Sequence, residues 1–265
     1  MLRVKDLAFS YRNKTILTQV SFELNYGQSV CLLGKNGVGK STLFKCLLRS
    51  IQPDSGQVLI DGVKVQDYSR NELAGLVSYI PQSPKGIFHF TVFDMVLMGT
   101  ASRLKNYQQP GQREKELADQ ALNRLNIGHL KNKHYSEISG GEQQLVIIAR
   151  SVAQQSKMII MDEPCASLDY GNQVMVLEMI KKLSTEGLLI IQATHDPNHA
   201  LQYGDHVMIL QQGTLTHQGK PSEILTGDRL ESLYGVPIAV HYLQEQGHQF
   251  CVPKMREESL YVENV

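Results

Sequence analysis

With 265 residues, of which 42% are hydrophobic and 20% charged, the chain is long enough for one large domain or two small ones with a packed core. Its 26 basic and 26 acidic side chains cancel, which argues against the broad positive surface of nucleic-acid-binding proteins, so no nucleic-acid partner is expected. The four cysteines include no CxxC pair and no hydrophobic run approaches about 18 residues, so we expect no zinc knuckle, no redox motif and no membrane-spanning segment.

The N-terminal part of the chain is predicted to form antiparallel strands, because residues 1–30 alternate hydrophobic and polar side chains and contain two turns. A short, continuously hydrophobic strand follows at 29–33 and ends at Gly34. Residues 40–49 have helical spacing. Two more strands are expected, one within 52–62 and one at 76–82.

A helical insertion is predicted from residue 83 to about residue 153, where helical patterns dominate around a polar stretch at 105–116. The next elements are a strand at 157–164, a helix at 173–186, a strand at 188–196 and a hairpin at 206–219. Uniformly hydrophobic strands that are followed by helices indicate a mostly parallel α/β core. The chain from residue 221 onward is not assigned.

Residues 34–41, GKNGVGKS, fit the phosphate-binding pattern GxxxxGK[ST] between a predicted strand and a predicted helix. Glycine lets the backbone turn its N–H groups onto phosphate oxygens, and the following helix directs its positive dipole end at the same anion. Lys40 is expected to reach the β- and γ-phosphates and Ser41 to hold Mg²⁺. The alternative is an ordinary glycine-rich turn, which the flanking elements disfavour. The predicted nucleotide-binding residues are Gly34, Asn36, Gly37, Gly39, Lys40, Ser41 and Thr42.

Two acids end the predicted strand at 157–164, and ligands bind at the carboxyl ends of strands in open α/β sheets. We therefore expect Asp162 beside the P-loop as a Mg²⁺ ligand and Glu163 as the base that polarises an attacking water. The alternative is a solvated acidic turn before Pro164. The P-loop favours the site interpretation.

His195 ends the strand at 188–196, at the same sheet edge as Asp162, which favours a site role over that of a core histidine. His195 and His199 also have the i, i+4 spacing of a zinc pair. Zinc is disfavoured because Pro197 interrupts the stretch and no third ligand is evident.

A second predicted anion site lies at residues 139–143, SGGEQ, where a serine and two glycines precede a helix. With this motif in place, residues 1 to about 240 resemble the ATP-binding subunit of an ABC transporter, with the family motifs in order. The resemblance implies a single ABC ATPase domain at 1–240 and a C-terminal tail at 241–265. It also implies a P-loop NTPase (RecA-like) α/β core, an N-terminal antiparallel β subdomain and an inserted α-helical subdomain at about 83–153.

In such proteins two subunits face head to tail, and each signature closes on ATP held by the P-loop of the other. The resemblance implies that the signature residues contact this ATP. They are Ser139, Gly140, Gly141 and Glu142. It further implies that Tyr11 stacks on the adenine and that His195 contacts the γ-phosphate. Gln82 is expected to contact Mg²⁺ and the attacking water and to connect to the membrane subunit. Asp169 lies in the loop that communicates between the subunits. It thus implies an ATPase with ATP and Mg²⁺ as cofactors.

Three residues depart from the commonest family pattern: Ile138 replaces a leucine, Glu142 replaces a glutamine and Lys35 replaces a frequent proline. Glu142 adds a negative charge near a phosphate-binding helix end, so we expect it to weaken closure on ATP slightly. None of the three changes removes a catalytic group. An active ATPase is therefore expected.

Four segments resemble importer ATPases for metal chelates such as iron–siderophore complexes, haem and cobalamin: 90–99, 167–173, 194–201 and 233–242. This resemblance implies integral membrane permease subunits as partners, a substrate-binding protein as an indirect partner, and a peripheral position at the cytoplasmic face of the cell (inner) membrane. The N-terminal residues also lack the hydrophobic region of a signal peptide. An importer of molybdate or tungstate with the same architecture stays open.

Two further function classes are disfavoured. A soluble ABC ATPase acting on ribosomes or DNA usually carries two cassettes or a long coiled-coil insertion, and this chain has one P-loop and balanced charge. A non-catalytic binding module would lack Glu163 or His195. A hydrophobic group either packs inside the helical insertion or lines a groove for a helix of the membrane subunit; its members are Phe88, Phe90, Val92 and Phe93.

Overall fold

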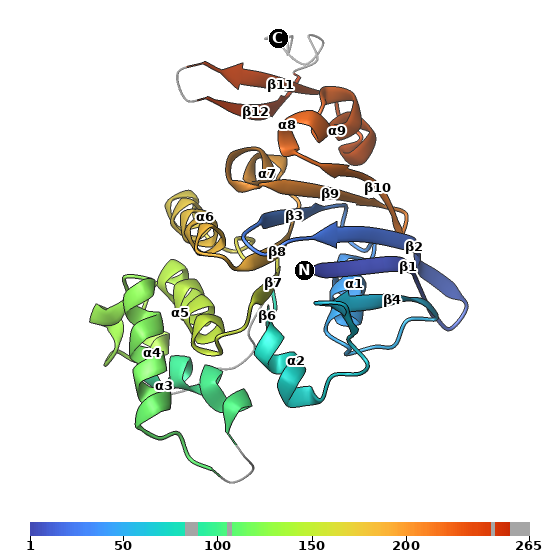
Figure 1. Cartoon of the computed structure of the whole chain (residues 1–265). Helices are drawn as coiled ribbons and strands as arrows, with labels where there is room; N and C mark the ends of the chain where they lie inside the picture. Colours follow the sequence, from blue (N-terminus) through green and yellow to red (C-terminus); the bar gives the residue numbers. More distant parts are fainter. Residues whose placement is uncertain (83–89, 105–107, 245–246, 255–265) are drawn as a thin grey trace.

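The computed structural model describes residues 1–82, 90–104, 108–244 and 247–254 (Figure 1). The strands are β1 (Leu2–Tyr11), β2 (Lys14–Leu24), β3 (Ser29–Leu33), β4 (Ser55–Ile60), β5 (Val63–Lys64), β6 (Val77–Ile80), β7 (Met158–Asp162), β8 (Leu189–Thr194), β9 (His206–Gln211), β10 (Thr214–Gly219), β11 (Ile238–Leu243) and β12 (His248–Pro253). The α-helices are α1 (Lys40–Leu47), α2 (Arg70–Leu76), α3 (Val92–Leu97), α4 (Gln112–Arg124), α5 (Gly140–Ala153), α6 (Tyr170–Thr185), α7 (Pro197–Tyr203), α8 (Pro221–Ile224) and α9 (Gly227–Tyr234). Short 3-10 helices are η1 (Met98–Arg103), η2 (Gly128–Leu130) and η3 (Tyr135–Glu137).

A six-stranded sheet in the order β10-β9-β3-β8-β7-β6 forms the centre of the molecule. The strands from β9 to β6 run parallel, and β10 pairs antiparallel with β9. Every residue of β3, β7 and β8 is buried, which explains why hydrophobic side chains dominate these strands in the sequence. The predicted mostly parallel α/β core is confirmed.

A second sheet, in the order β2-β1-β4-β5, is antiparallel throughout. Its inner side packs on α1 through one hydrophobic cluster that includes Leu7, Leu17 and Phe44. The predicted N-terminal antiparallel β subdomain is therefore confirmed. Because β2 ends only five residues before β3 begins, this sheet is tied closely to the start of the core sheet.

Helices α3, α4 and α5 pack together beside the core sheet, below and to the left in Figure 1. Their cluster includes Val92, Leu122 and Val146, all buried. This arrangement confirms the helical subdomain. The polar stretch predicted at 105–116 lies partly outside the described residues, and residues 112–116 form the start of α4.

The proposed hydrophobic groove of residues 88–93 is only partly supported. Phe88 lies outside the described residues. Val92 is completely buried in the helical core, and Phe93 packs against the same core with the Lys131 ammonium 4.4 Å from its ring centre. Phe90 is 37% exposed, so of these side chains it is the one at the surface.

Elements without a sequence assignment include α2, α7 and the C-terminal part of the chain. A capping box begins α2: the Ser69 side chain accepts from the N–H of Glu72, and the Glu72 carboxylate accepts from the N–H of Ser69. The C-terminal elements α8, α9, β11 and β12 pack over β3, β9 and α7. The predicted domain boundary after residue 240 falls inside β11, which pairs with β12 along its length.

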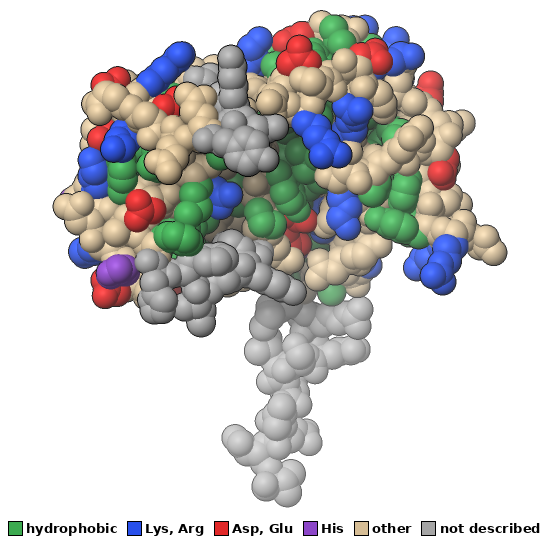
Figure 2. Space-filling model, turned by 90° about the horizontal axis from the view of Figure 1, so that it is seen from below, with side chains coloured by type: hydrophobic (Ala, Val, Ile, Leu, Met, Phe, Trp, Pro, Cys, Tyr) green, Lys and Arg blue, Asp and Glu red, His purple; other side chains and the backbone are tan. Residues whose placement is uncertain are grey.

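Hydrophobic side chains are exposed in a hollow on the face seen from below Figure 1, and Lys and Arg side chains lie nearby (Figure 2). Within the described residues, none of the helices combines the length and hydrophobicity needed to cross a bilayer.

Candidate functional site

The P-loop joins the end of β3 to the start of α1. Gly37 and Gly39 have φ values of 78° and 115°, in a region that side chains rarely adopt. Gly39 also has Ile16 and Leu17 atoms 3.1–3.2 Å from where a Cβ would lie. As the N-cap of α1 it offers no side-chain acceptor, so no N-cap side chain binds the N–H groups of the first turn. That leaves them for an anion.

Lys40, the first residue of α1, is only 6% exposed. Its Nζ donates to the carbonyl oxygen of Gly34 at 2.6 Å and lies 3.8 Å from Oε1 of Glu163. Burial lowers the pKa of Lys40, while the Glu163 and Asp162 carboxylates partly offset that shift. The loop therefore encloses a buried ammonium at the end of β3, where a phosphate could replace its present carbonyl partners.

Asp162, the last residue of β7, lies directly beside the start of α1. The Ser41 hydroxyl donates to Oδ2 of Asp162 at 2.7 Å, and the Tyr79 hydroxyl is 3.5 Å from the same oxygen. A hydroxyl and a carboxylate of this kind are ligands that suit Mg²⁺. The donor set therefore fits the predicted metal, with Ser41 and Asp162 as the candidate ligands.

Glu163 is the point on which several predicted site residues converge. Gln82 donates from Nε2 to Oε2 of Glu163 at 3.1 Å, and Nδ1 of His195 lies 3.6 Å from the same oxygen. The backbone of Glu163 has a φ of 50°, and its N–H donates to the carbonyl oxygen of Ala193 at 3.2 Å. Left-handed backbone is uncommon at a non-glycine residue; eight other non-glycine residues of the described chain also adopt it, and Glu163 is the one that lines the cavity.

A cavity of about 310 Å³ brings these groups together. It is lined by Ile16, Asn36, Gly37, Gly39, Lys40, Ser41, Thr42, Gln82, Asp162 and Glu163. Ile16, on β2, is the residue that the sequence prediction missed, because its position in an alternating strand gives no sign of the contact. Gly34 lies just behind the cavity, where a Cβ would come within 2.8 Å of Val38.

Several predicted site residues lie outside this cavity, among them Tyr11 and His195. Tyr11 is 44% exposed and packs edge-on against Phe9, with ring centres 4.7 Å apart. His195 is 59% exposed and lines a small neighbouring cavity together with Glu163. The ring of His199 contacts Thr194 and Asp196, and the described residues contain no group of three or more His, Cys, Asp or Glu side chains placed to hold a metal ion.

The predicted signature forms the N-terminus of α5. Ser139 is the N-cap, and its N–H donates to the Glu142 carboxylate at 2.8 Å. This hydrogen bond lowers the pKa of Glu142, so its charge supports its own helix end. Whether that charge weakens closure on ATP stays a prediction. None of residues 139–142 lines the P-loop cavity of the same chain.

Asp169 lies close to the signature through Asn172. Asp169 is the N-cap of α6 and accepts from the backbone N–H of Asn172 at 2.9 Å and from its side chain at 2.8 Å. The Asn172 side chain in turn occupies the space that a Cβ on Gly141 would need, with the Cβ atoms 2.8 Å apart. Asn172 is a second residue that the sequence prediction missed: Asp169 is a typical N-cap residue, but nothing in the sequence indicates that Asn172 packs on Gly141.

Replacing Gly141 by alanine is expected to lower the free energy of unfolding by about 1–3 kcal/mol, because the new methyl group overlaps Asn172. The displaced Asn172 would also release Asp169. Gly75→Ala is the matched control, because nothing lies within 4 Å of its Cβ position on the exposed side of α2. Thermal unfolding of both variants measures the difference, and equal stability would contradict the packing of Asn172 on Gly141.

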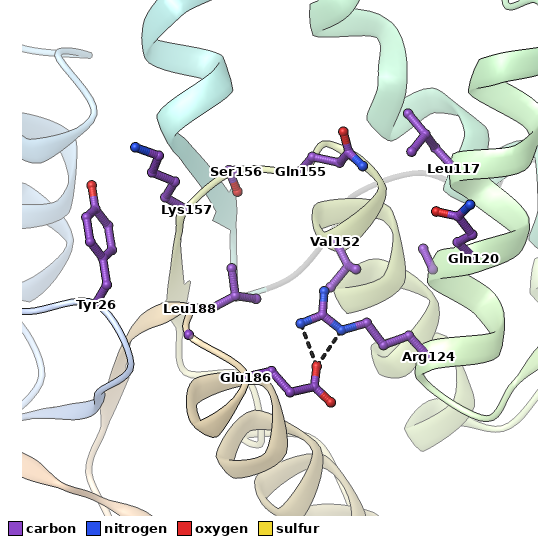
Figure 3. A pocket seen from close by; sticks show the side chains of 12 residues that line it. Tyr26, Leu117, Gln120, Arg124, Val152, Gln155, Ser156, Lys157, Glu186 and Leu188 are labelled. Atoms are coloured by element: carbon purple, nitrogen blue, oxygen red, sulfur yellow. Dashed lines mark hydrogen bonds and ion pairs between the residues drawn. The ribbon is translucent and has the colours of Figure 1, made fainter.

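A second cavity, of about 490 Å³, lies between the helical subdomain and the core (Figure 3). Arg124, at the end of α4, reaches Glu186 just beyond α6, with Nε and Nη2 both 2.5 Å from Oε2 (Figure 3). Lys182 donates to the carbonyl oxygen of Arg124 at 3.2 Å. None of the predicted site residues lines this cavity, so it is separate from the P-loop site.

Comparison with known proteins agrees with this geometry. The family model described as "ABC transporter" matches residues 17–166. The chain belongs to the ABC transporter family. An ABC transporter ATP-binding protein of Haemophilus influenzae is 44% identical over 234 residues, which cover 88% of this chain and 89% of that protein.

Other relatives are named for particular transport substrates. A Helicobacter pylori protein named for iron chelatin transport is 33% identical over 90% of this chain and 94% of its own length. A solved metal-chelate-type ABC transporter, in an inward-facing conformation, has 30% identity and a TM-score of 0.86, and the match covers 98% of both chains. This member of the ABC transporter family is thus the ATP-binding motor subunit of an importer, and it hydrolyses ATP to drive transport.

Proposed function

We propose that this ABC ATPase works as a head-to-tail dimer on membrane permease subunits and drives the uptake of a metal chelate of the iron–siderophore, haem or cobalamin type. We infer the dimer because two parts of the proposed ATP site, the P-loop cavity and the N-terminus of α5, lie apart within one chain. The P-loop cavity and the α5 N-terminus of one chain do not meet, so each needs a complementary surface. A solved bacterial ABC transporter cassette with 26% identity and a TM-score of 0.71 is dimeric.

The proposed roles at the cavity follow from the contacts described above. The N–H groups of Gly34, Asn36, Gly37 and Gly39 and the first turn of α1, at Lys40, Ser41 and Thr42, hold the phosphates, and Lys40 neutralises their charge. Ser41, Asp162 and Gln82 would hold Mg²⁺, and the ion would offset the charge that develops on the phosphate oxygens. Tyr11 stacks on the adenine.

Glu163 accepts the proton of the attacking water in this proposal. Gln82 and His195 both reach Oε2, and Lys40 faces Oε1, so the carboxylate is oriented on two sides before any substrate binds. A fixed base needs little reorganisation during the reaction. His195, whose ring lies beside Glu163, is proposed to contact the γ-phosphate.

The signature of the second subunit completes the site. Ser139, Gly140 and Gly141 present the N-terminus of α5 to the phosphates bound by the other chain. Glu142 supports that helix end from within. Because Asn172 packs on Gly141 and binds Asp169, a movement of one signature is transmitted to the loop at the dimer interface.

The permease contact is proposed for the helical subdomain near Phe90. Phe90 follows Gln82 by eight positions in the sequence and is 37% exposed. We expect a short helix of a membrane subunit to pack against this side chain. This contact would hold the subunit at the cytoplasmic face of the membrane. The substrate-binding protein is then an indirect partner.

The metal-chelate assignment rests on the relatives. Proteins named for hemin, molybdate and manganese transport are 32–36% identical to this chain, so the relatives alone leave both molybdate and manganese as further candidates. Uptake of labelled iron–siderophore, haem, cobalamin and molybdate is measured in cells lacking the chain and in cells that regain either wild type or Glu163→Gln. Restored uptake of one chelate by the wild type alone supports the proposal, and restored uptake of molybdate alone contradicts it.

ATP affinity is expected to fall at alkaline pH earlier than for a site with an ordinary lysine. Burial places the pKa of Lys40 below its usual 10.5 in the free protein, so the ammonium loses its proton and its attraction for phosphate as the pH rises toward that value. Titration of a fluorescent ATP analogue from pH 7 to pH 10 measures this effect. Lys40→Arg should shift the decline to higher pH, and an unchanged decline would contradict the assignment.

A further inference from the structure

The loop that carries His195 is held by the C-terminal part of the chain, beyond the residues that match the family model. The hydroxyl of Tyr234, the last residue of α9, donates to the backbone carbonyl oxygen of His195 at 2.8 Å. A tyrosine hydroxyl keeps its proton at physiological pH and can donate, and burial raises the pKa of Tyr234 further still. The two residues are 39 positions apart in the sequence.

The position of Tyr234 is fixed by the packing of its helix. Leu230 and Leu233 of α9 are buried in one cluster with Leu33, which ends β3 just before the P-loop. Gly235 ends α9 in the left-handed conformation, with a φ of 79°. The side chain of Tyr234 is therefore anchored on the same sheet edge that carries the nucleotide site.

A second contact holds the residues that follow His195. Asp196 is the N-cap of α7 and accepts from the N–H of Asn198 at 2.8 Å. The Asn198 side chain bonds β12 in both directions: it donates to the carbonyl oxygen of Cys251 at 3.2 Å and accepts from its N–H at 2.8 Å. The start of α7 is thus fixed to the C-terminal hairpin.

His195 itself has little packing. Its side chain is 59% exposed, and Nδ1 of the ring lies 3.6 Å from Oε2 of Glu163 at the edge of the site. An exposed side chain keeps a useful orientation only if its backbone is held, because small displacements at a reacting group are costly. Besides the local bond from the Asp196 N–H to Oγ1 of Thr194, α9 holds the His195 carbonyl and β12 holds Asn198 three residues on.

We propose that Tyr234 is a positioning residue for ATP hydrolysis: its hydroxyl holds the His195 carbonyl, and this contact keeps the imidazole beside Glu163. The inference rests on the role given to His195 under the proposed function. It adds that the C-terminal segment from α9 to β12 is part of the machinery for the chemical step, through the loop and not through contact with nucleotide.

Tyr234→Phe removes this hydroxyl and keeps the ring. Loss of one hydrogen bond of about 0.5–1.5 kcal/mol predicts a kcat about two- to tenfold lower. The KM for ATP should stay unchanged, because the P-loop is not touched. Tyr242→Phe is the matched control, since Tyr242 lies on β11 with 61% of its side chain exposed, and it should keep the wild-type kcat.

Amide hydrogen exchange of residues 194–199 reports the loop directly and needs no activity. The proposal predicts faster exchange there in Tyr234→Phe than in Tyr242→Phe. Unchanged exchange, or an unchanged kcat in a variant of wild-type stability, overturns it. A purely structural tyrosine would lower the rate by the same factor in wild type and in His195→Ala, whereas a positioning role predicts little further loss in His195→Ala.

The two proposals fail in different ways. If His195→Ala keeps the full kcat, the role of His195 in hydrolysis is wrong, and hydrogen exchange still decides whether Tyr234 holds the loop. If His195→Ala loses activity and Tyr234→Phe changes neither kcat nor exchange, the role of His195 stands and the positioning role of Tyr234 is wrong.

Discussion

Glu163→Gln is expected to lower kcat for ATP hydrolysis by about 10²–10⁴, the usual loss for a missing general base. Glutamine has nearly the shape of glutamate, so its amide can still contact Gln82 and His195, but it cannot take the proton of the attacking water. Nucleotide binding should survive, because Lys40 and the P-loop are unchanged. Steady-state hydrolysis and nucleotide binding measure the two effects separately.

The same variant should accumulate as a dimer in the presence of ATP, since closure no longer leads to hydrolysis and reopening. Light scattering with and without ATP measures this. Glu142→Gln is an instructive comparison, because it makes the same chemical change at the signature and leaves the proposed base intact. Near-normal turnover in Glu163→Gln would contradict the assignment of the base.

Lys40→Ala is expected to weaken ATP binding by about 10²–10³-fold, the range for losing a buried, hydrogen-bonded charge partner. The variant loses the ammonium that faces the phosphates and leaves the Glu163 carboxylate without its nearby cation. That uncompensated carboxylate adds repulsion toward the phosphates. The expected loss therefore appears in the dissociation constant and not only in kcat.

Lys45→Ala is the matched control for Lys40→Ala, because Lys45 lies on the same helix with its side chain exposed. Isothermal titration with ATP and Mg²⁺ compares the two, and thermal unfolding shows that both remain folded. Equal affinities for ATP would mean that the nucleotide does not bind at the start of α1.

The sequence predicts best those parts of the site where the local backbone conformation or burial requires a particular type of residue. The P-loop needs glycine at Gly37 and Gly39 because their backbone is left-handed. The buried parallel strand β7 is hydrophobic from Met158 to Met161, so the two acids that follow, Asp162 and Glu163, are conspicuous in the sequence. The cavity accordingly contains Lys40, Asp162 and Glu163 as predicted.

The missed features depend on contacts between distant segments or on short elements. Ser69 and Glu72 form a capping box that marks α2, yet the helix has only seven residues and little hydrophobic periodicity. Ile16 reaches the cavity, and Tyr234 reaches the His195 carbonyl, only because the sheet brings their elements together. No local pattern encodes such contacts.

The signature illustrates a different limit of prediction from sequence, namely that a single chain does not reveal which partner uses a surface. From the residues alone, Ser139, Gly140 and Gly141 predict an anion-binding helix end, and the structure contains that helix end. Its use by a second subunit came from the family resemblance. The single chain agrees with that use in one respect, because the signature lies outside the P-loop cavity of its own chain.

The shared site between two subunits is tested most directly by mixing two inactive variants. Lys40→Ala removes the P-loop lysine. Gly140→Asp places a carboxylate at the α5 N-terminus, where the nearest atom to a Cβ is 3.7 Å away, so it fits the fold and repels phosphate. In a mixed head-to-tail dimer, one of the two sites combines an intact P-loop with an intact signature.

Hydrolysis is measured for each variant alone and for an equal mixture. A head-to-tail dimer predicts recovery to about a quarter of the wild-type rate, because about half of the dimers are mixed and each has one complete site. A mixture that shows only the average of the two separate rates would contradict a site built from two chains.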